Sequence, residues 1–242
     1  MPSIKKYDIQ RGIDYCIKEN LFEDLNELYK SIPDGKCNGC GNCCMESVGA
    51  SFIEFLNIYN YLNENKNIKN IVMEKILDYY FLEYIQKMSC PFKDENNRCL
   101  IYSVRPLNCR IYGHWLKEDY EKNYERIKKE NIKFADDMKK NYNIKISDEV
   151  LNYKIKYCEY FKPSKGYMSK EKRLNFYDNM VMLDSKLYSQ GIVNVNFKDR
   201  GVVDYFIESI FYENVSRSIK INISKYLNKS MNILNKLKKL IL

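Results

Sequence analysis

The stretch CNGCGNCC, residues 37–44, places four cysteines within eight positions. Cys37, Cys40 and Cys43 are separated by gaps of two residues, which let successive sulfurs turn toward one point. Two of the intervening residues are glycines, which permit backbone angles that other residues resist. This spacing is typical of iron–sulfur loops, and paired C-x2-C units are typical of zinc sites. The stretch therefore predicts a loop built around a metal.

A second cysteine set follows in CPFKDENNRCLIYSVRPLNCR, which begins at Cys90 and includes Cys99 and Cys109. The polar run at 93–97 predicts a turn that brings Cys99 back toward Cys90. A nearby positive charge lowers the pKa of a cysteine and favours the thiolate that a metal needs. Three arginines flank these thiols and are expected to act in this way: Arg98, Arg105 and Arg110.

Eight cysteines are thus candidate metal ligands: Cys37, Cys40, Cys43, Cys44, Cys90, Cys99, Cys109 and Cys158. They could fill two four-thiolate sites, or one site with spare thiols. Adjacent cysteines are awkward ligands for one tetrahedral ion, so Cys43 and Cys44 are expected to do different jobs, and either could be the ligand. Cys158 is expected to reach the site late, from a helix. Cys16 and the lone His114 are expected to be packing residues, and no catalytic residue can be assigned.

The composition indicates a globular, mainly α-helical protein with little or no β-structure. Its 242 residues are 45% hydrophobic and 30% charged, with only 9 glycines and 5 prolines. A chain of this length can bury a core without disulfides. No apolar run has the length of a signal peptide or a membrane span, which predicts a cytoplasmic protein with reduced thiols. That compartment favours a metal over disulfides.

Hydrophobic periodicity predicts the helices around the cysteine loops. Helices are expected over 13–32, from a capping box at Ser51 and Glu54 onward, over 68–88, and over 117–142. Further expectations are a short strand at 99–102, a short helix from Arg105-Pro106, a helix that reaches Cys158, a linker at 162–170, and two or three helices beyond it. The expected organisation is a cysteine-cluster domain, 1–165, and a C-terminal helical extension, 166–242, packed on it.

The net charge of +8 is concentrated at the C-terminus. Residues 214–242 hold seven Lys and Arg and no Asp or Glu, which leaves +1 for residues 1–213. Apolar residues fall on one helical face of this segment, including Ile223, Tyr226, Leu227 and Leu234. It is expected to be a terminal helix with a basic outer face. That face could bind an acidic protein partner or a membrane surface, whereas no feature supports nucleic acid.

Together, the two cysteine motifs resemble the CxxCxxCC (YkgJ-like) family of cysteine cluster proteins, described as a zinc- or iron-chelating domain. The resemblance covers about residues 35–112 and implies metal binding. The matching positions are Cys37, Cys40, Gly41, Cys43, Cys44, Cys90, Pro91, Phe92, Cys99, Ile101, Tyr102, Arg105, Pro106, Cys109 and Arg110.

More distantly, the cysteine set is similar to that of the flagellin lysine N-methylases, which are thought to hold an iron–sulfur cluster. That resemblance implies an S-adenosylmethionine-dependent protein lysine N-methylase as an alternative function. This chain is shorter, and it lacks a glycine-rich strand-turn-helix for that cofactor. A third possibility is a metal-stabilised interaction module that uses the basic tail. For the metal, three cysteines in one tight loop favour a [4Fe–4S] cluster over zinc.

Overall fold

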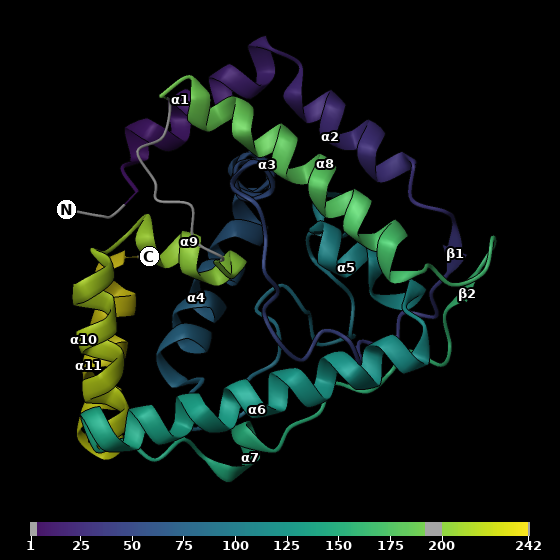
Figure 1. Ribbon diagram of the computed structural model, residues 1–242. Helices are drawn as coiled ribbons and strands as arrows, with labels where there is room; N and C mark the ends of the chain where they lie inside the picture. Colours follow the sequence, from purple (N-terminus) through teal and green to yellow (C-terminus); the bar gives the residue numbers. More distant parts are fainter. Residues whose placement is uncertain (1–3, 192–199, 242) are drawn as a thin grey trace.

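A computed structural model describes residues 4–191 and 200–241 and confirms a mainly α-helical fold (Figure 1). Within these ranges the helices are α1 Lys6–Lys18, α2 Leu21–Lys30, α3 Phe52–Glu64, α4 Lys66–Leu82, α5 Leu107–Ile111, α6 Lys117–Tyr142, α7 Asp148–Leu151, α8 Lys170–Ser189, α9 Val202–Glu208, α10 Glu213–Lys225 and α11 Leu227–Ile241. The two short strands β1 Gly35–Lys36 and β2 Lys162–Pro163 pair antiparallel, and 3-10 turns occupy Tyr102–Val104 and Tyr112–His114.

Helices α3 and α4 form the centre of the core. Helix α3 begins with the predicted capping box, in which Ser51 and Glu54 each bond to the other's backbone N–H. Its two phenylalanines, Phe52 and Phe55, are fully buried, and the ring of Phe55 stacks on that of Tyr205 in α9 with centroids 5.1 Å apart. Helices α1 and α8 pack on α3, while α9, α10 and α11 pack on α4. The irregular cysteine segments lie between α8 and α6 (Figure 1).

The N-terminal helical predictions hold with shifted boundaries. The stretch expected as one helix over 13–32 is two helices, because Asn20 adopts a left-handed conformation with φ of 55°. Helix α4 ends at Leu82, short of the predicted 88. Beyond Leu82, the Tyr84 carbonyl accepts the N–H of Ser147, and the Lys87 ammonium pairs with Glu46. Because of these contacts, the chain does not continue as a helix to residue 88. Helix α6 has the predicted bounds.

Two local predictions in the cysteine region are wrong. No strand forms over 99–102 in the structure, because Leu100 donates its N–H to Phe92 and the chain then enters a 3-10 turn. Cys158 does not lie on a helix. Helix α7 is only four residues long and ends at Asn152, whose side chain caps the Asp148 carbonyl. Cys158 instead lies in an irregular stretch, directly before the bend at 159–160 that precedes β2.

The C-terminal segment packs on α4 through buried residues and ion pairs. Within 166–241 the described part contains four helices, where two or three were expected. Ile223 and Leu234 are fully buried as predicted, whereas Tyr226 is 60% exposed, and the Leu227 side chain lies outside the described residues. The Lys238 ammonium pairs with Asp78 of α4 at 2.6 Å. The division of the chain at residue 165 stays a prediction.

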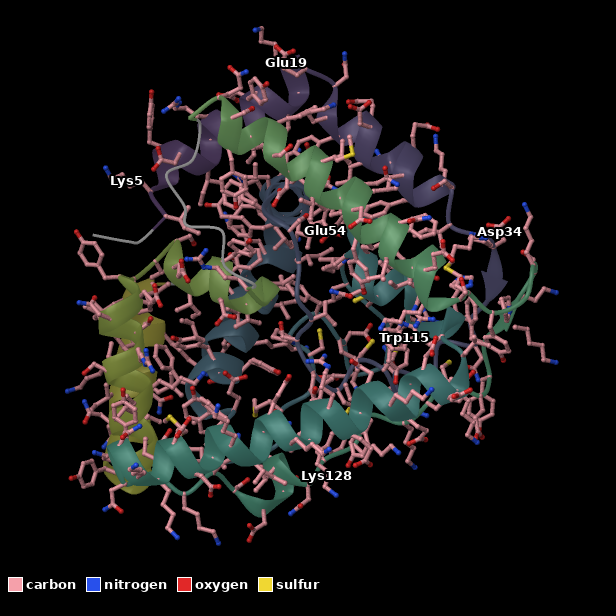
Figure 2. The ribbon with its side chains drawn as sticks, viewed as in Figure 1. Lys5, Glu19, Asp34, Glu54, Trp115 and Lys128 are labelled. Carbon is pink, nitrogen blue, oxygen red and sulfur yellow. The ribbon has the colours of Figure 1, made fainter. Side chains whose placement is uncertain are left out.

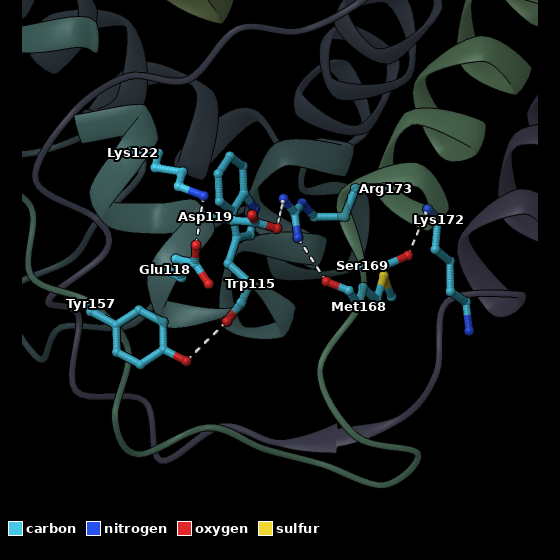
Figure 3. A network of polar contacts seen from close by, with 9 residues as sticks. All are labelled: Trp115, Glu118, Asp119, Lys122, Tyr157, Met168, Ser169, Lys172 and Arg173. Carbon is cyan, nitrogen blue, oxygen red and sulfur yellow. Dashed lines mark hydrogen bonds and ion pairs between the residues drawn. The ribbon is translucent and has the colours of Figure 1, made fainter. Parts of the chain in front are cut away.

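A polar network joins α8 to α6 beside the cysteine segments (Figure 3). The buried Arg173 guanidinium bonds to Asp119 of α6 at 2.8 Å and to the Met168 carbonyl at 2.7 Å, and it lies over the Trp115 ring. The Tyr157 hydroxyl donates to the Trp115 carbonyl at 2.9 Å. These contacts fix the segment that carries Cys158 against the start of α6.

Asp184 of α8 is buried against the first turn of α3. Its carboxylate accepts hydrogen bonds from the backbone N–H groups of Phe52, at 3.0 Å, and Ile53, at 2.7 Å. Burial raises the pKa of this carboxyl from 3.8 to about 6, since the two donors offset only part of the desolvation. Between these two pH values the native protein holds the Asp184 proton more tightly than the unfolded chain does.

The free energy of unfolding is therefore expected to fall by about 3 kcal/mol as the pH rises from about 4 to about 6, and this contribution is then constant at higher pH. Urea unfolding of the protein and of Asp184→Asn over this range measures the effect, because the neutral amide has no proton to lose. Curves of unfolding free energy against pH that run parallel for the two proteins would contradict this account.

Candidate metal centre

The two cysteine segments lie directly against each other. Gly41 and Asn97 touch, since a Cβ at Gly41 would stand 2.9 Å from the Asn97 Cβ. The Cys90 N–H donates to the Cys44 carbonyl at 3.1 Å. Gly39 and Gly41 have φ angles of 67° and 69°, the left-handed conformation that glycine adopts most easily. The glycines thus let the first loop turn tightly onto the second, as the sequence indicated.

The predicted turn at 93–97 brings Cys99 back to Cys90. The Asp94 carboxylate accepts the N–H groups of Asn96, at 2.9 Å, and Arg98, at 2.7 Å. Lys93 and Cys99 then form an isolated antiparallel bridge. A carboxylate that gathers backbone N–H groups in this way is typical of an Asx turn.

Cys109 is positioned from the core through Glu54. Helix α5, which carries this cysteine, begins after Pro106, and the Leu107 N–H donates to the buried Glu54 carboxylate at 2.6 Å. The next side chain, Asn108, donates to the Gly49 carbonyl at 2.7 Å and accepts the Tyr177 hydroxyl. In the sequence, Glu54 is recognisable only as part of a helix cap. Nothing in the residues around Glu54 indicates its contact with α5, 53 positions away.

A cavity of about 330 Å³ opens between these segments. Six of the predicted ligands line it: Cys37, Cys43, Cys44, Cys90, Cys99 and Cys109. Cys40 and Cys158 are not among its lining residues. The Sγ atoms of Cys43 and Cys44 are 3.9 Å apart, and both residues line the cavity. Although they are neighbours in the sequence, neither is directed away from the site.

Four of these thiols influence one another electrostatically. Burial raises the pKa of Cys90 to about 12 and also raises the pKa of Cys99 and Cys109. The charge that Cys43 would carry raises the pKa of each of these three thiols further. The pKa of Cys43 itself is raised chiefly by its contact with Cys44 and then by burial. Thiols in such a setting are protonated and become thiolates when a metal replaces their protons.

The remaining candidates lie at the edge of this group. Cys37 is exposed, and its sulfur accepts the Gly39 N–H at 3.4 Å. Burial raises the pKa of Cys158, and the charges of Cys43 and Cys40 raise it further, so these three thiols are also neighbours. The pairing of β1 with β2 places the start of the first loop beside the segment that follows Cys158.

Three residues near the motifs take other roles. Cys16 is a fully buried core residue. His114 is 1% exposed and packs on the Phe161 ring at 4.6 Å; burial lowers its pKa, and it does not line the cavity. Arg110 was expected to favour thiolates, but its guanidinium lies 3.8 Å from the centre of the Tyr29 ring. Arg98 and Arg105 do line the cavity.

A second cavity, of about 420 Å³, adjoins the first beneath α6. The two share Cys43, Glu46 and Tyr112 on their walls, and Tyr120 and Tyr124 of α6 line the far side. No sequence pattern indicated this space, because its wall combines a long surface helix with a loop that precedes it by about 80 positions. The thiol cavity is therefore open on the side that faces α6.

The donor set fits a thiophilic metal. Thiolates are soft ligands that select zinc, copper(I) and iron–sulfur clusters. No group of three or more His, Cys, Asp or Glu side chains in the described ranges is arranged so that it could hold a metal ion directly. The thiols are thus gathered around a cavity rather than converged on one point.

These features define a helical protein with a cysteine-lined chelating site. The CxxCxxCC family, whose description reads "Putative zinc- or iron-chelating domain", matches residues 36–159, and the chain belongs to this family. The match includes all eight candidate cysteines and extends past the resemblance seen at 35–112. No curated protein and no solved structure matches the chain. None of the helices in the described ranges is long and apolar enough to cross a membrane.

Proposed function

We propose that this protein binds an iron–sulfur cluster, of the [4Fe–4S] type, in the thiol cavity. Cys43, Cys90, Cys99 and Cys109 are the proposed cluster ligands. Of the four other candidates, Cys37 and Cys44 also line the cavity, whereas Cys40 and Cys158 do not; these four can exchange with the ligands or hold a second metal. The proposal places the protein in a reducing compartment such as the cytoplasm, where free thiols persist.

The cavity of about 330 Å³ with six thiols on its wall is the observation that carries this proposal. A single zinc ion binds sulfur at about 2.3 Å and would draw four thiolates to within about 3.8 Å of one another. A cluster needs a wider arrangement, because its thiolates bind different iron atoms. The open cavity and the absence of a preformed three-ligand group in the described residues both favour the wider arrangement.

The protein's own residues supply the setting for this group. When bound, such a cluster supplies one-electron transfer, at a potential that its surroundings adjust. The apolar residues Phe92, Ile101 and Val202 line the cavity and limit the access of water. The adjoining cavity under α6 provides space for a small molecule beside Cys43.

Two further functions stay predictions from the sequence. A lysine N-methylase would need a site for S-adenosylmethionine, and the space beneath α6 is the candidate for it; calorimetric titration with this cofactor is the decisive test. An acidic partner would bind the C-terminal helices, where Lys225, Lys236 and Lys239 are exposed. Truncation is a poor test of that surface, because Ile223 and Leu234 belong to the core.

The test of the cluster is anaerobic purification followed by absorption spectroscopy and by iron, sulfide and zinc analysis of the same sample. We expect a brown protein with equal amounts of iron and sulfide, about four of each per chain. The matched control is Cys16→Ala, which removes a thiol of the core and should leave these values unchanged. A colourless protein with one or two zinc ions would show that the site binds zinc and not a cluster. A protein without metal would overturn the proposal of a chelating site.

A further inference from the structure

Arg105 presents an unpaired charge to the thiol cavity. Its side chain lines the cavity, and its guanidinium carbon lies 3.9 Å from the centre of the Tyr102 ring. The Nε atom is buried and has no hydrogen-bond partner. Within the described part of the chain, no carboxylate lies within 4.0 Å of this guanidinium. The side chain is half-buried, and its Nε atom has lost water without gaining a partner, so a negative group in the cavity would supply what this cation lacks.

The other charged groups on the cavity wall do not supply that group. The Glu46 carboxylate pairs with the Lys87 ammonium at 2.8 Å. Asp94 does not line the cavity, and its carboxylate accepts the backbone N–H groups of its own turn. Arg98, the second arginine on the wall, is exposed to solvent and needs no partner. The groups that share the cavity wall with Arg105 are the thiols, among them Cys43, Cys99 and Cys109.

We propose that Arg105 is the counter-charge of the metal–thiolate group, a positioning residue that offsets the negative charge left when the thiols bind metal. The inference rests on the proposed function. Four thiolates carry four negative charges, of which a divalent ion cancels two, so the centre remains an anion. A partly buried anion of this kind is stabilised by a cation held close to it, and Arg105 stands there before any metal is bound.

The contact with Tyr102 explains why the cation is an arginine. A planar guanidinium stacks on an aromatic ring, keeps its charge at any physiological pH, and is weakly hydrated, so it can stay in a dry wall. The stacking fixes the guanidinium without using its N–H groups. Those groups are then available to the sulfurs, in the way that residues around a metal site donate to its ligands.

The experiment compares Arg105→Gln, Arg105→Lys and the control Arg98→Gln, which removes an exposed charge from the same wall. The probe is zinc alone, titrated into reduced, metal-free protein in competition with a coloured chelator, with the melting temperature of the metal-free protein as a second measurement. We expect Arg105→Gln to weaken zinc binding tenfold to a hundredfold. Arg105→Lys keeps the charge but not the stacking on Tyr102, so it should recover part of this loss, and Arg98→Gln should lose little.

The melting temperature of metal-free Arg105→Gln should not fall, because the charge has no partner until metal binds. In protein that carries a cluster, the same variant should have a more negative midpoint potential, since the reduced centre holds more negative charge. Equal zinc affinity in Arg105→Gln and the parent protein overturns the inference and leaves the chelating site intact. If Arg105→Lys binds zinc as weakly as Arg105→Gln, Arg105 has a structural role instead. The same conclusion follows if metal-free Arg105→Gln melts at a lower temperature than the parent protein. A parent protein that binds no metal overturns both proposals.

Discussion

Replacing Cys109 with serine is expected to abolish metal binding and to remove the stability that the metal confers. Cys109 lies where α5 meets the cavity, and its thiol interacts with those of Cys43, Cys90 and Cys99. A ligand present at a thousand times its Kd stabilises a folded protein by about 4 kcal/mol. Because the serine variant cannot bind the metal, we expect a loss of this size relative to the metal-loaded protein.

Metal content and urea unfolding, each measured with and without bound metal, check this prediction. Cys16→Ala and Cys37→Ser are the controls, since Cys16 is in the core and Cys37 is exposed at the rim. Cys37→Ser should lose much less metal than Cys109→Ser. If Cys109→Ser keeps its metal and its stability, the proposed ligand set is wrong. If Cys37→Ser loses as much as Cys109→Ser, the ligands come from the first loop instead.

The structure contains several of the local features that the sequence predicted. The capping box at Ser51 fixes the start of α3, and the alternating Glu and Lys residues of α6 give that helix its predicted bounds. The turn at 93–97 forms as expected because Asp94 gathers the N–H groups of its own turn. Each of these features depends on residues a few positions apart, whose preferences are present in the sequence itself.

Features that depend on distant partners could not be predicted. Asp184 bonds to the first turn of α3 across 132 positions, and Glu54 bonds to Leu107 across 53. Cys158 was placed on a helix because the residues before it have a helical pattern, but the tertiary contacts of Tyr157 hold that segment extended. The cysteine spacing predicted a metal-binding loop. It could not show that Cys43 joins the later cysteines while Cys40 does not line their cavity.

Glu54→Ala is expected to lower the free energy of unfolding by at least about 3 kcal/mol and to weaken metal binding as well. Glu54 is 2% exposed and lies near the centre of the molecule (Figure 2). Its Oε1 accepts the Tyr29 hydroxyl at 2.8 Å and the Leu107 N–H at 2.6 Å, and its Oε2 accepts the Ser51 N–H at 2.9 Å. Alanine would leave these three buried donors without partners, at about 1–3 kcal/mol each.

The loss of metal affinity is the part of this prediction that links the core to the site. One carboxylate connects α2, the start of α3 and the start of α5, and α5 carries Cys109. Glu54→Gln keeps the size of the side chain and one acceptor oxygen, so it should lie between Glu54→Ala and the parent protein in both measurements. Glu64→Ala removes an exposed carboxylate from the same helix and should change neither.

Urea unfolding of the metal-free proteins isolates the effect on the core, and chelator competition isolates the effect on the site. Burial raises the pKa of Glu54, and the donors that surround the carboxylate lower it. The three contacts that join α2, α3 and α5 therefore also favour the charged carboxylate. A Glu54→Ala protein that unfolds more easily but binds metal as tightly as its parent would show that α5 is positioned by Asn108 and the packing of Leu107. Weaker binding in Glu54→Ala, partly restored in Glu54→Gln, would show that the helix core sets the position of a metal ligand.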